Sequence, residues 1–298
     1  MPSQNETGST RGTEAGLILL AVIWGVNFPL IKIALEVVPP LAFNALRFPM
    51  AAVALLLLLR SLGIRSKMER SDVLSILALG VLGHVGYQLL FILGVARTTA
   101  GNASLLLATS PAWTVMLSAM TGSERIPRPV WGGVVATLVG MGLVVAGGAG
   151  LEFQRSTLDG DLLMMLAAIA WASYTVGSRP LVQKYGAMPV TGWTLWIGTV
   201  GVLALGLPSL RGVEVGAIEP GIWAIVAYSG VLSISVAYAL WNRGVRRLGN
   251  SRTAVYANLV PVVALLTGWV ALGERPTPLQ LAGAVVILGG LRLTRVRR

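Results

Sequence analysis

The amino-acid sequence predicts an all-α integral membrane protein in which ten transmembrane helices form two inverted five-helix repeats. Its composition, its apolar spans and an internal repeat lead to this fold class. Of the 298 residues, 55% are hydrophobic and only 12% are charged. A chain of this size has too few polar groups to cover a surface in contact with water. We therefore expect the lipid bilayer to surround it.

The apolar spans justify the ten helices in chain order. Each is a stretch of about 17 to 22 mainly apolar residues, the length at which a helix crosses a hydrocarbon core of about 30 Å. The expected spans cover residues 16–35, 40–59, 73–93, 102–121, 130–149, 162–179, 190–207, 222–242, 254–272 and 279–294. Residues 1–13 are rich in Ser, Thr, Asn and Gly and lack the basic segment of a signal peptide. We expect them to form a disordered cytoplasmic tail.

An internal repeat relates the two halves of the chain. Residues of the fourth and fifth spans recur 150 positions later, and a weaker match has an offset of 147. The first match pairs Pro111, Glu124, Arg125, Gly133 and Gly140 with Pro261, Glu274, Arg275, Gly283 and Gly290, and the second pairs Glu14 and Trp24 with Asp161 and Trp171. Because each half holds five spans, an odd number, equivalent parts face opposite sides of the membrane. The sequence thus predicts one repeat over residues 14–153 and an inverted one over 154–298, an arrangement typical of secondary transporters.

The lysines and arginines predict the orientation. If the N terminus is cytoplasmic, the few basic residues on the outer side are Lys32, Arg97, Arg155, Arg211 and Arg275. The positive-inside rule therefore places both termini in the cytoplasm, and we expect a multi-pass protein of the bacterial inner membrane. The net charge of +11 is explained by this topology and by attraction to anionic lipid. Nucleic-acid binding, which needs a clustered basic face on a soluble module, is not expected.

Polar and aromatic residues share one face on each of four spans. On the third span, for example, His84, Tyr87, Gln88 and Phe91 follow an i, i+3, i+4, i+7 spacing. Such faces should turn away from lipid, toward one another. The predicted substrate-binding residues are Trp24, Asn27, His84, Tyr87, Gln88, Phe91, Trp113, Trp171, Tyr174, Ser235, Tyr238, Trp241 and Asn242. The alternative is that these side chains are interfacial anchors or hydrogen-bond between helices.

Other features of the spans concern motion and packing. Pro29, Pro111 and Pro261 fall inside spans, where each kinks its helix and acts as a hinge or only shapes packing. The fifth and tenth spans contain Val, Leu, Ala and Gly. They read as peripheral packing helices that approach closely at small residues, Gly132, Ala136 and Gly140 in the fifth.

Several chemistries lack the residues that they need. The chain has no cysteine, Walker loop, nucleophile elbow or metal-spaced histidine cluster, so we expect no cofactor, no metal and no enzyme activity. No Asp or Glu lies well within any expected span. This favours facilitated diffusion or exchange over ion coupling, unless His84 titrates. For Arg47, a partner within the protein is favoured over a substrate carboxylate. Glu124 and Glu274 are expected to cap helices or to pair with the adjoining arginines.

Three segments resemble the drug/metabolite transporter superfamily, EamA type: Trp24-Gly-Val-Asn-Phe-Pro29, Arg47-Phe48, and residues 272–283 with the sequence Leu-Gly-Glu-Arg-Pro-Thr-Pro-Leu-Gln-Leu-Ala-Gly. The resemblance extends over nearly the whole chain. It implies ten helices in two inverted repeats, a central cavity, and export of amino acids or similar metabolites by alternating access. The first repeat departs from the pattern, with Ser123 where the second has Gly273.

The composition of the polar faces restricts the solute. Tyr, Trp, Phe, Asn, Gln and Ser without a cluster of fixed charges suit a small amphipathic molecule of little net charge, such as an aromatic or apolar amino acid. The alternatives are export of other drugs or metabolites and, less favoured, a channel or a membrane-embedded enzyme. Saturable flux separates a transporter from a channel, and unchanged product separates it from an enzyme.

Overall fold

The computed structural model of the protein describes residues 4–64, 66–122, 127–148 and 155–293. These residues form helices and short connections, and no strand occurs among them. Eight helical segments are long and apolar enough to cross a membrane, and two shorter apolar helices, α12 (Leu259–Leu272) and α13 (Pro278–Leu293), complete the ten spans. The predicted fold class is confirmed.

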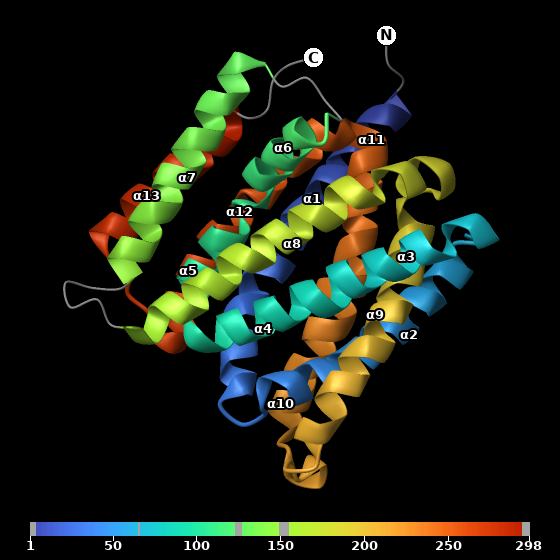
Figure 1. Ribbon diagram of the computed structural model, residues 1–298, viewed down its shortest axis with the longest axis horizontal. Helices are drawn as coiled ribbons and strands as arrows, with labels where there is room; N and C mark the ends of the chain where they lie inside the picture. Colours follow the sequence, from blue (N-terminus) through green and yellow to red (C-terminus); the bar gives the residue numbers. More distant parts are fainter. Residues whose placement is uncertain (1–3, 65, 123–126, 149–154, 294–298) are drawn as a thin grey trace.

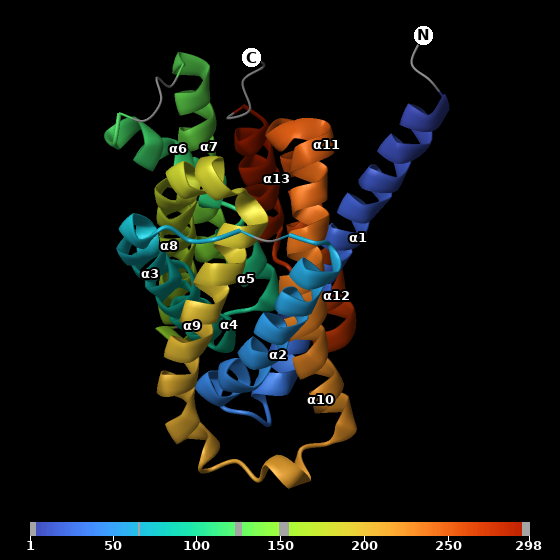
Figure 2. The same cartoon turned by 90° about the vertical axis from the view of Figure 1, so that its right-hand side faces the viewer.

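The first repeat consists of α1 to α7. Its elements are α1 (Gln4–Leu35), α2 (Pro40–Ser61), η1 (Arg70–Asp72), α3 (Val73–Gly80), η2 (Val81–Gly86), α4 (Tyr87–Arg97), α5 (Ala100–Leu107), α6 (Ser110–Met120) and α7 (Arg128–Gly148). The second repeat consists of α8 (Arg155–Tyr185), α9 (Ala187–Leu210), η3 (Val215–Ala217), α10 (Pro220–Ala227), η4 (Tyr228–Val236), α11 (Ala237–Ala257), α12 and α13. The start of α1 and the end of α13 lie at one end of the bundle, and the connection between α9 and α10 lies at the other (Figure 2).

The α7–α13 pair shows the two-fold relation between the repeats. These helices lie side by side at one edge of the bundle (Figure 1). A Cβ atom added at Gly140 would meet the carbonyl oxygen of Gly283 at 2.8 Å, and one added at Gly290 would meet that of Gly133 at 2.7 Å. The 150-residue offset exchanges these two contacts, so the interface is self-complementary, as a two-fold axis requires. The prediction of close packing was right for Gly140 and wrong for Gly132, which has open space around it.

The repeat is also visible in helix irregularities. Spans three and eight each contain a π-helical segment, η2 and η4, and the residues of η2 map by the 150 offset into η4. Spans four and nine are each interrupted, after α5 and after α11, at equivalent positions Ala108 and Asn258. The expected span 254–272 is thus divided, since its first residues belong to α11.

The prolines occupy two kinds of position. Pro29 lies inside the continuous helix α1. Pro111 and Pro261 do not kink a helix interior, because they lie in the first turns of α6 and α12. There a missing N–H leaves no helical hydrogen bond unmade. The irregularity comes just before each proline, and a hinge role for these residues stays a prediction.

The N-terminal tail differs from the expectation. Residues 4–13 continue α1 instead of being disordered. No proline interrupts the chain between them and the first span, so the helix extends by one hydrogen bond per residue. Packing against the bundle is described from Thr13 on, because Thr13 and Leu17 are buried and Leu17 lies against Gly244 of α11.

Candidate functional site

Aromatic side chains from both repeats meet between them. The ring centroid of Trp171, on α8, lies 5.1 Å from that of Tyr87, 5.3 Å from that of Tyr174 and 6.4 Å from that of Tyr238. We call these four residues the central aromatic cluster. Tyr87 and Tyr174 are buried, whereas Trp171 and Tyr238 are partly exposed. The cluster therefore has an accessible edge.

The cluster is extended along span three. The ring of His84 lies 5.6 Å from that of Tyr174, and the ring of Phe91 lies 5.7 Å from that of Tyr87. The predicted common face of His84, Tyr87 and Phe91 thus contacts the second repeat at Tyr174 and at Trp171. These rings lie between the repeats, where the sequence predicted a central cavity.

His84 is held by hydrogen bonding. Its side chain is buried, and its Nε2 lies 3.2 Å from the hydroxyl of Thr194 on α9. That hydroxyl also lies 3.1 Å from the hydroxyl of Tyr174. Gly198 of α9 packs so closely that an added Cβ would overlap the Cβ of His84. For His84, this arrangement agrees with the alternative in which the side chain forms a hydrogen bond between helices.

Arg47 lies inside the bundle, and the described residues that it bonds to are all neutral. Its Nε donates to Asn44 Oδ1 at 2.9 Å, its Nη1 to Ser229 Oγ at 2.7 Å and its Nη2 to Gln88 Oε1 at 2.8 Å. Partners within the protein were expected, but an acidic one is absent among the residues with described placement. Gln88, a predicted site residue, therefore positions Arg47.

The remaining predicted residues are more dispersed. Trp24 and Trp241 form a separate pair, 5.9 Å between ring centroids. The Ser235 hydroxyl donates to a backbone carbonyl of α2, and the Asn242 amide to one of its own helix, as in the helix-packing alternative. The Trp113 indole donates to a hydroxyl one turn earlier in its own span and has no described ring contact with the cluster.

Asn27 is an exception among these residues. It is buried on α1, yet its Oδ1 has no hydrogen-bond partner among the described residues. A buried amide oxygen without a partner costs free energy. Such an atom is a candidate contact for a solute N–H group.

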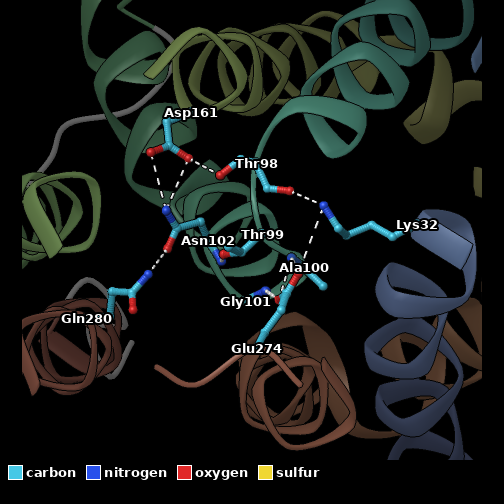
Figure 3. Close-up of polar contacts among 9 residues, drawn as sticks. All are labelled: Lys32, Thr98, Thr99, Ala100, Gly101, Asn102, Asp161, Glu274 and Gln280. Atoms are coloured by element: carbon cyan, nitrogen blue, oxygen red, sulfur yellow. Dashed lines mark hydrogen bonds and ion pairs between the residues drawn. The ribbon is translucent and has the colours of Figure 1, made fainter. Parts of the chain in front are cut away.

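A network of polar side chains, the interrepeat network, connects the two repeats (Figure 3). Asp161 of α8 is buried and accepts hydrogen bonds from the Thr98 hydroxyl at 2.5 Å and from the Asn102 amide at 3.3 Å. The side-chain oxygen of Asn102, Oδ1, in turn accepts a hydrogen bond from the Gln280 side-chain amide of α13 at 2.7 Å. Each of these bonds joins the first repeat to the second.

Glu274 completes this interrepeat network. Its carboxylate accepts from the backbone N–H of Ala100 at 2.9 Å and of Gly101 at 3.4 Å, and it lies 3.9 Å from the ammonium group of Lys32. Glu274 was expected to cap a helix, and it does so: from the second repeat it caps the N terminus of α5 in the first. Sequence reasoning missed the network, although the pairing of Glu14 with Asp161 in the repeat was a signal. Glu124 lies outside the described residues.

Exposed contacts also connect the two repeats. The Lys184 ammonium lies 2.6 Å from Glu69 and 2.8 Å from Asp72, and the Tyr185 hydroxyl donates to Asp72 at 2.5 Å. Because their charges are partly solvated, such ion pairs contribute little to stability. They are easily broken and remade.

A membrane protein with ten spans in two inverted repeats and a site between them has the architecture of a secondary transporter. The model of the EamA-like transporter family matches residues 13–146 and 158–296. The chain therefore belongs to the EamA-like transporter family, and the resemblance seen in its motifs is confirmed.

Curated relatives match over almost the full chain. An uncharacterized transporter, YyaM, of Bacillus subtilis is 29% identical, covering 95% of this chain and 93% of its own. A probable terminal-alkyne amino-acid exporter of Streptantibioticus cattleyicolor is 29% identical over 94% and 92%. A probable amino-acid metabolite efflux pump of Salmonella typhimurium is 29% identical over 94% and 95%. A solved crystal structure shares the fold, with a TM-score of 0.66 at 20% identity over 93% of this chain and 94% of that one.

Proposed function

We propose that the protein exports small amphipathic metabolites, foremost amino acids with aromatic or apolar side chains, by alternating access between its two repeats. The observation that carries this proposal is the central aromatic cluster, to which both repeats contribute. Aromatic rings offer apolar faces to a solute side chain, and their hydroxyl and indole groups hydrogen-bond its polar end. The names of two relatives, a probable terminal-alkyne amino-acid exporter and a probable amino-acid metabolite efflux pump, support amino acids as the solute class.

The contacts between the repeats at both ends fit alternating access. A solute at the central aromatic cluster leaves only if the repeats separate at one end while they stay together at the other. The interrepeat network would close one end and the Lys184 ion pairs the other. In this proposal both termini are cytoplasmic in the bacterial inner membrane, so the interrepeat network faces outward.

Counterflow in proteoliposomes tests the proposal. Vesicles loaded with unlabelled L-phenylalanine should take up labelled L-phenylalanine transiently, with saturation. Trp171→Ala should reduce exchange by about tenfold or more, because an aromatic pair contributes about 0.5–1.5 kcal/mol beyond its buried area and Trp171 makes three such contacts.

A matched control is Trp269→Ala, since this tryptophan is 54% exposed on α12. It should leave exchange unchanged. Absence of saturable exchange for every member of a labelled amino-acid panel would refute the proposed function. Equal loss in both variants would mean that Trp171 acts through folding and not at the site.

A further inference from the structure

Arg47 carries a buried charge that the described protein does not neutralise. The side chain is 2% exposed, and each of its hydrogen-bond acceptors is an uncharged amide or hydroxyl oxygen. Transfer of an ion from water into such surroundings is unfavourable even after the protein relaxes around it. Neutral hydrogen bonds and the faces of nearby rings recover only part of this cost.

The guanidinium group keeps unused donors. It has five N–H groups, and three of them, one each on Nε, Nη1 and Nη2, make hydrogen bonds to described residues. Of the two that remain, one belongs to each terminal nitrogen. A carboxylate accepts two parallel hydrogen bonds from these two nitrogens, an arrangement that lysine does not reproduce.

The position of Arg47 relates it to both repeats and to the cluster. It lies on α2, it donates to Gln88 of α4 in its own repeat, and it donates to Ser229 of η4 in the other. Gln88 follows Tyr87 in the chain, and the guanidinium carbon lies 5.8 Å from the ring centroid of Phe91, which contacts Tyr87. A solute whose side chain lies in the cluster would thus have its polar end toward Arg47.

Two hydrogen-bond partners of Arg47, Gln88 and Ser229, lie at π-helical segments. Gln88 comes two residues after η2, and Ser229 lies within η4. Single π-helical turns inside α-helices occur frequently at functional sites, where the wider turn displaces side chains from regular positions. The occurrence of both segments at one arginine, one from each repeat, indicates a site and not only a packing contact.

On these observations we infer that Arg47 binds the carboxylate of the transported solute. This inference rests on the proposed function and specifies its solute class: a monocarboxylate with an apolar or aromatic side chain. Binding replaces uncharged acceptors with an anion and neutralises the buried charge. An amine or cation of the same shape would meet repulsion at this position.

The test compares L-phenylalanine with L-phenylalaninamide, which keeps the ring and the amino group but replaces the carboxylate with a neutral amide. Each competes against labelled L-phenylalanine counterflow through the full-length protein. In the wild type, phenylalanine should compete better than the amide. In Arg47→Gln this preference should fall by about tenfold or more, because a hydrogen bond to a charged group contributes about 1.5–3 kcal/mol.

Arg60→Gln is the matched control, since Arg60 is exposed in the last turn of the same helix. Arg60→Gln should keep the wild-type preference for the acid over the amide. In Arg47→Lys this preference should lie between that of the wild type and that of Arg47→Gln. Equal weakening of the acid and the amide in Arg47→Gln would overturn the inference and make Arg47 a structural link.

If Arg47→Gln exchanges too slowly to measure, thermal stabilisation of the purified variants by the same two probes replaces counterflow. Stabilisation of the wild type by phenylalanine over the amide, lost in Arg47→Gln, supports the inference, and an unchanged preference refutes it. This readout also separates the two proposals. Absence of saturable exchange in the wild type for the whole amino-acid panel refutes the proposed function, while the preference measured by stabilisation still decides the role of Arg47.

Discussion

At the scale of single residues, the site combines rings that stack with polar groups that neighbouring helices hold in place. His84 illustrates the second kind, because Thr194 and Tyr174 surround its ring. Its position beside Tyr174 of the central aromatic cluster agrees with the predicted helix face. Its hydrogen bond to Thr194 of α9 favours a positioning role over direct contact with a solute.

We expect His84→Gln to keep exchange within about tenfold of the wild type, because a glutamine amide can replace a neutral hydrogen bond that contributes about 1 kcal/mol. His84→Ala should unfold at a lower temperature, since it leaves the Thr194 hydroxyl with a cavity beside it. Counterflow and thermal unfolding measure the two effects. If a pH gradient drives accumulation in the wild type and not in His84→Gln, His84 couples transport to protons and the positioning role is wrong.

At the scale of elements, glycines determine how closely the helices approach. The α7–α13 interface places backbone carbonyl oxygens where a side chain would lie. Van der Waals packing drives helix association in lipid, so this approach stabilises the pair. On α7 the close contacts lie at Gly133 and Gly140, which share one helix face. Gly132, which was predicted to pack closely, is one residue away from this face.

Gly140→Leu should lower the unfolding temperature, because the new side chain meets backbone atoms of Gly283 and Ile287 at 2.8 Å. Overpacking of this kind costs about 1–3 kcal/mol. Gly132→Leu, on the same helix, enters open space and should change stability by less than about 0.5 kcal/mol. Thermal unfolding in detergent measures both. A similar effect of the two changes would contradict the described interface.

The interrepeat network should control access at its end of the molecule. In Asp161→Asn, an amide group that donates would face the donating amide of Asn102, so the contact weakens. We expect a cysteine at Ser104, a buried position one turn deeper on α5 than Ala100, to react faster with a water-soluble maleimide in this variant. Asp159→Asn is the control, because this carboxylate is exposed two residues earlier on α8. Unchanged reactivity in Asp161→Asn would mean that the network does not close this end.

At the scale of the whole molecule, inversion makes the two ends equivalent in architecture but not in chemistry. The network around Asp161 is buried, whereas the Lys184 ion pairs at the other end are exposed. Screening by salt weakens exposed ion pairs more than buried ones. We therefore expect the two ends to respond differently to ionic strength.

The absence of native cysteine makes the topology directly testable. A cysteine at Lys67 should react with an impermeant maleimide only from the cytoplasmic side, and one at Val215 only from the opposite side, because these exposed positions belong to connections at opposite ends. Inside-out and right-side-out vesicles distinguish the two. Reaction of both positions from the same side would overturn the inverted arrangement.

The sequence by itself determined the ten spans, the inversion and the residues that share a face, because hydrophobic length, helical period and a constant offset are local or repetitive properties. Tyr87, Trp171 and Tyr238 were predicted to face inward on this basis, and their rings meet. The repeat also indicated Gly140 and Gly283, whose backbones lie in close contact.

Only the tertiary structure decided what lies against each face. Asp161 occupies a helix end in the sequence, where a solvated carboxylate is expected, yet α4, α5 and the network around Asn102 bury it. Glu274 caps a helix that begins 174 residues earlier in the chain. Arg47 bonds to Ser229 of the other repeat. The physical reason is common to all three: burial and hydrogen bonding depend on which helices lie side by side, and helical period specifies a face but not its neighbour.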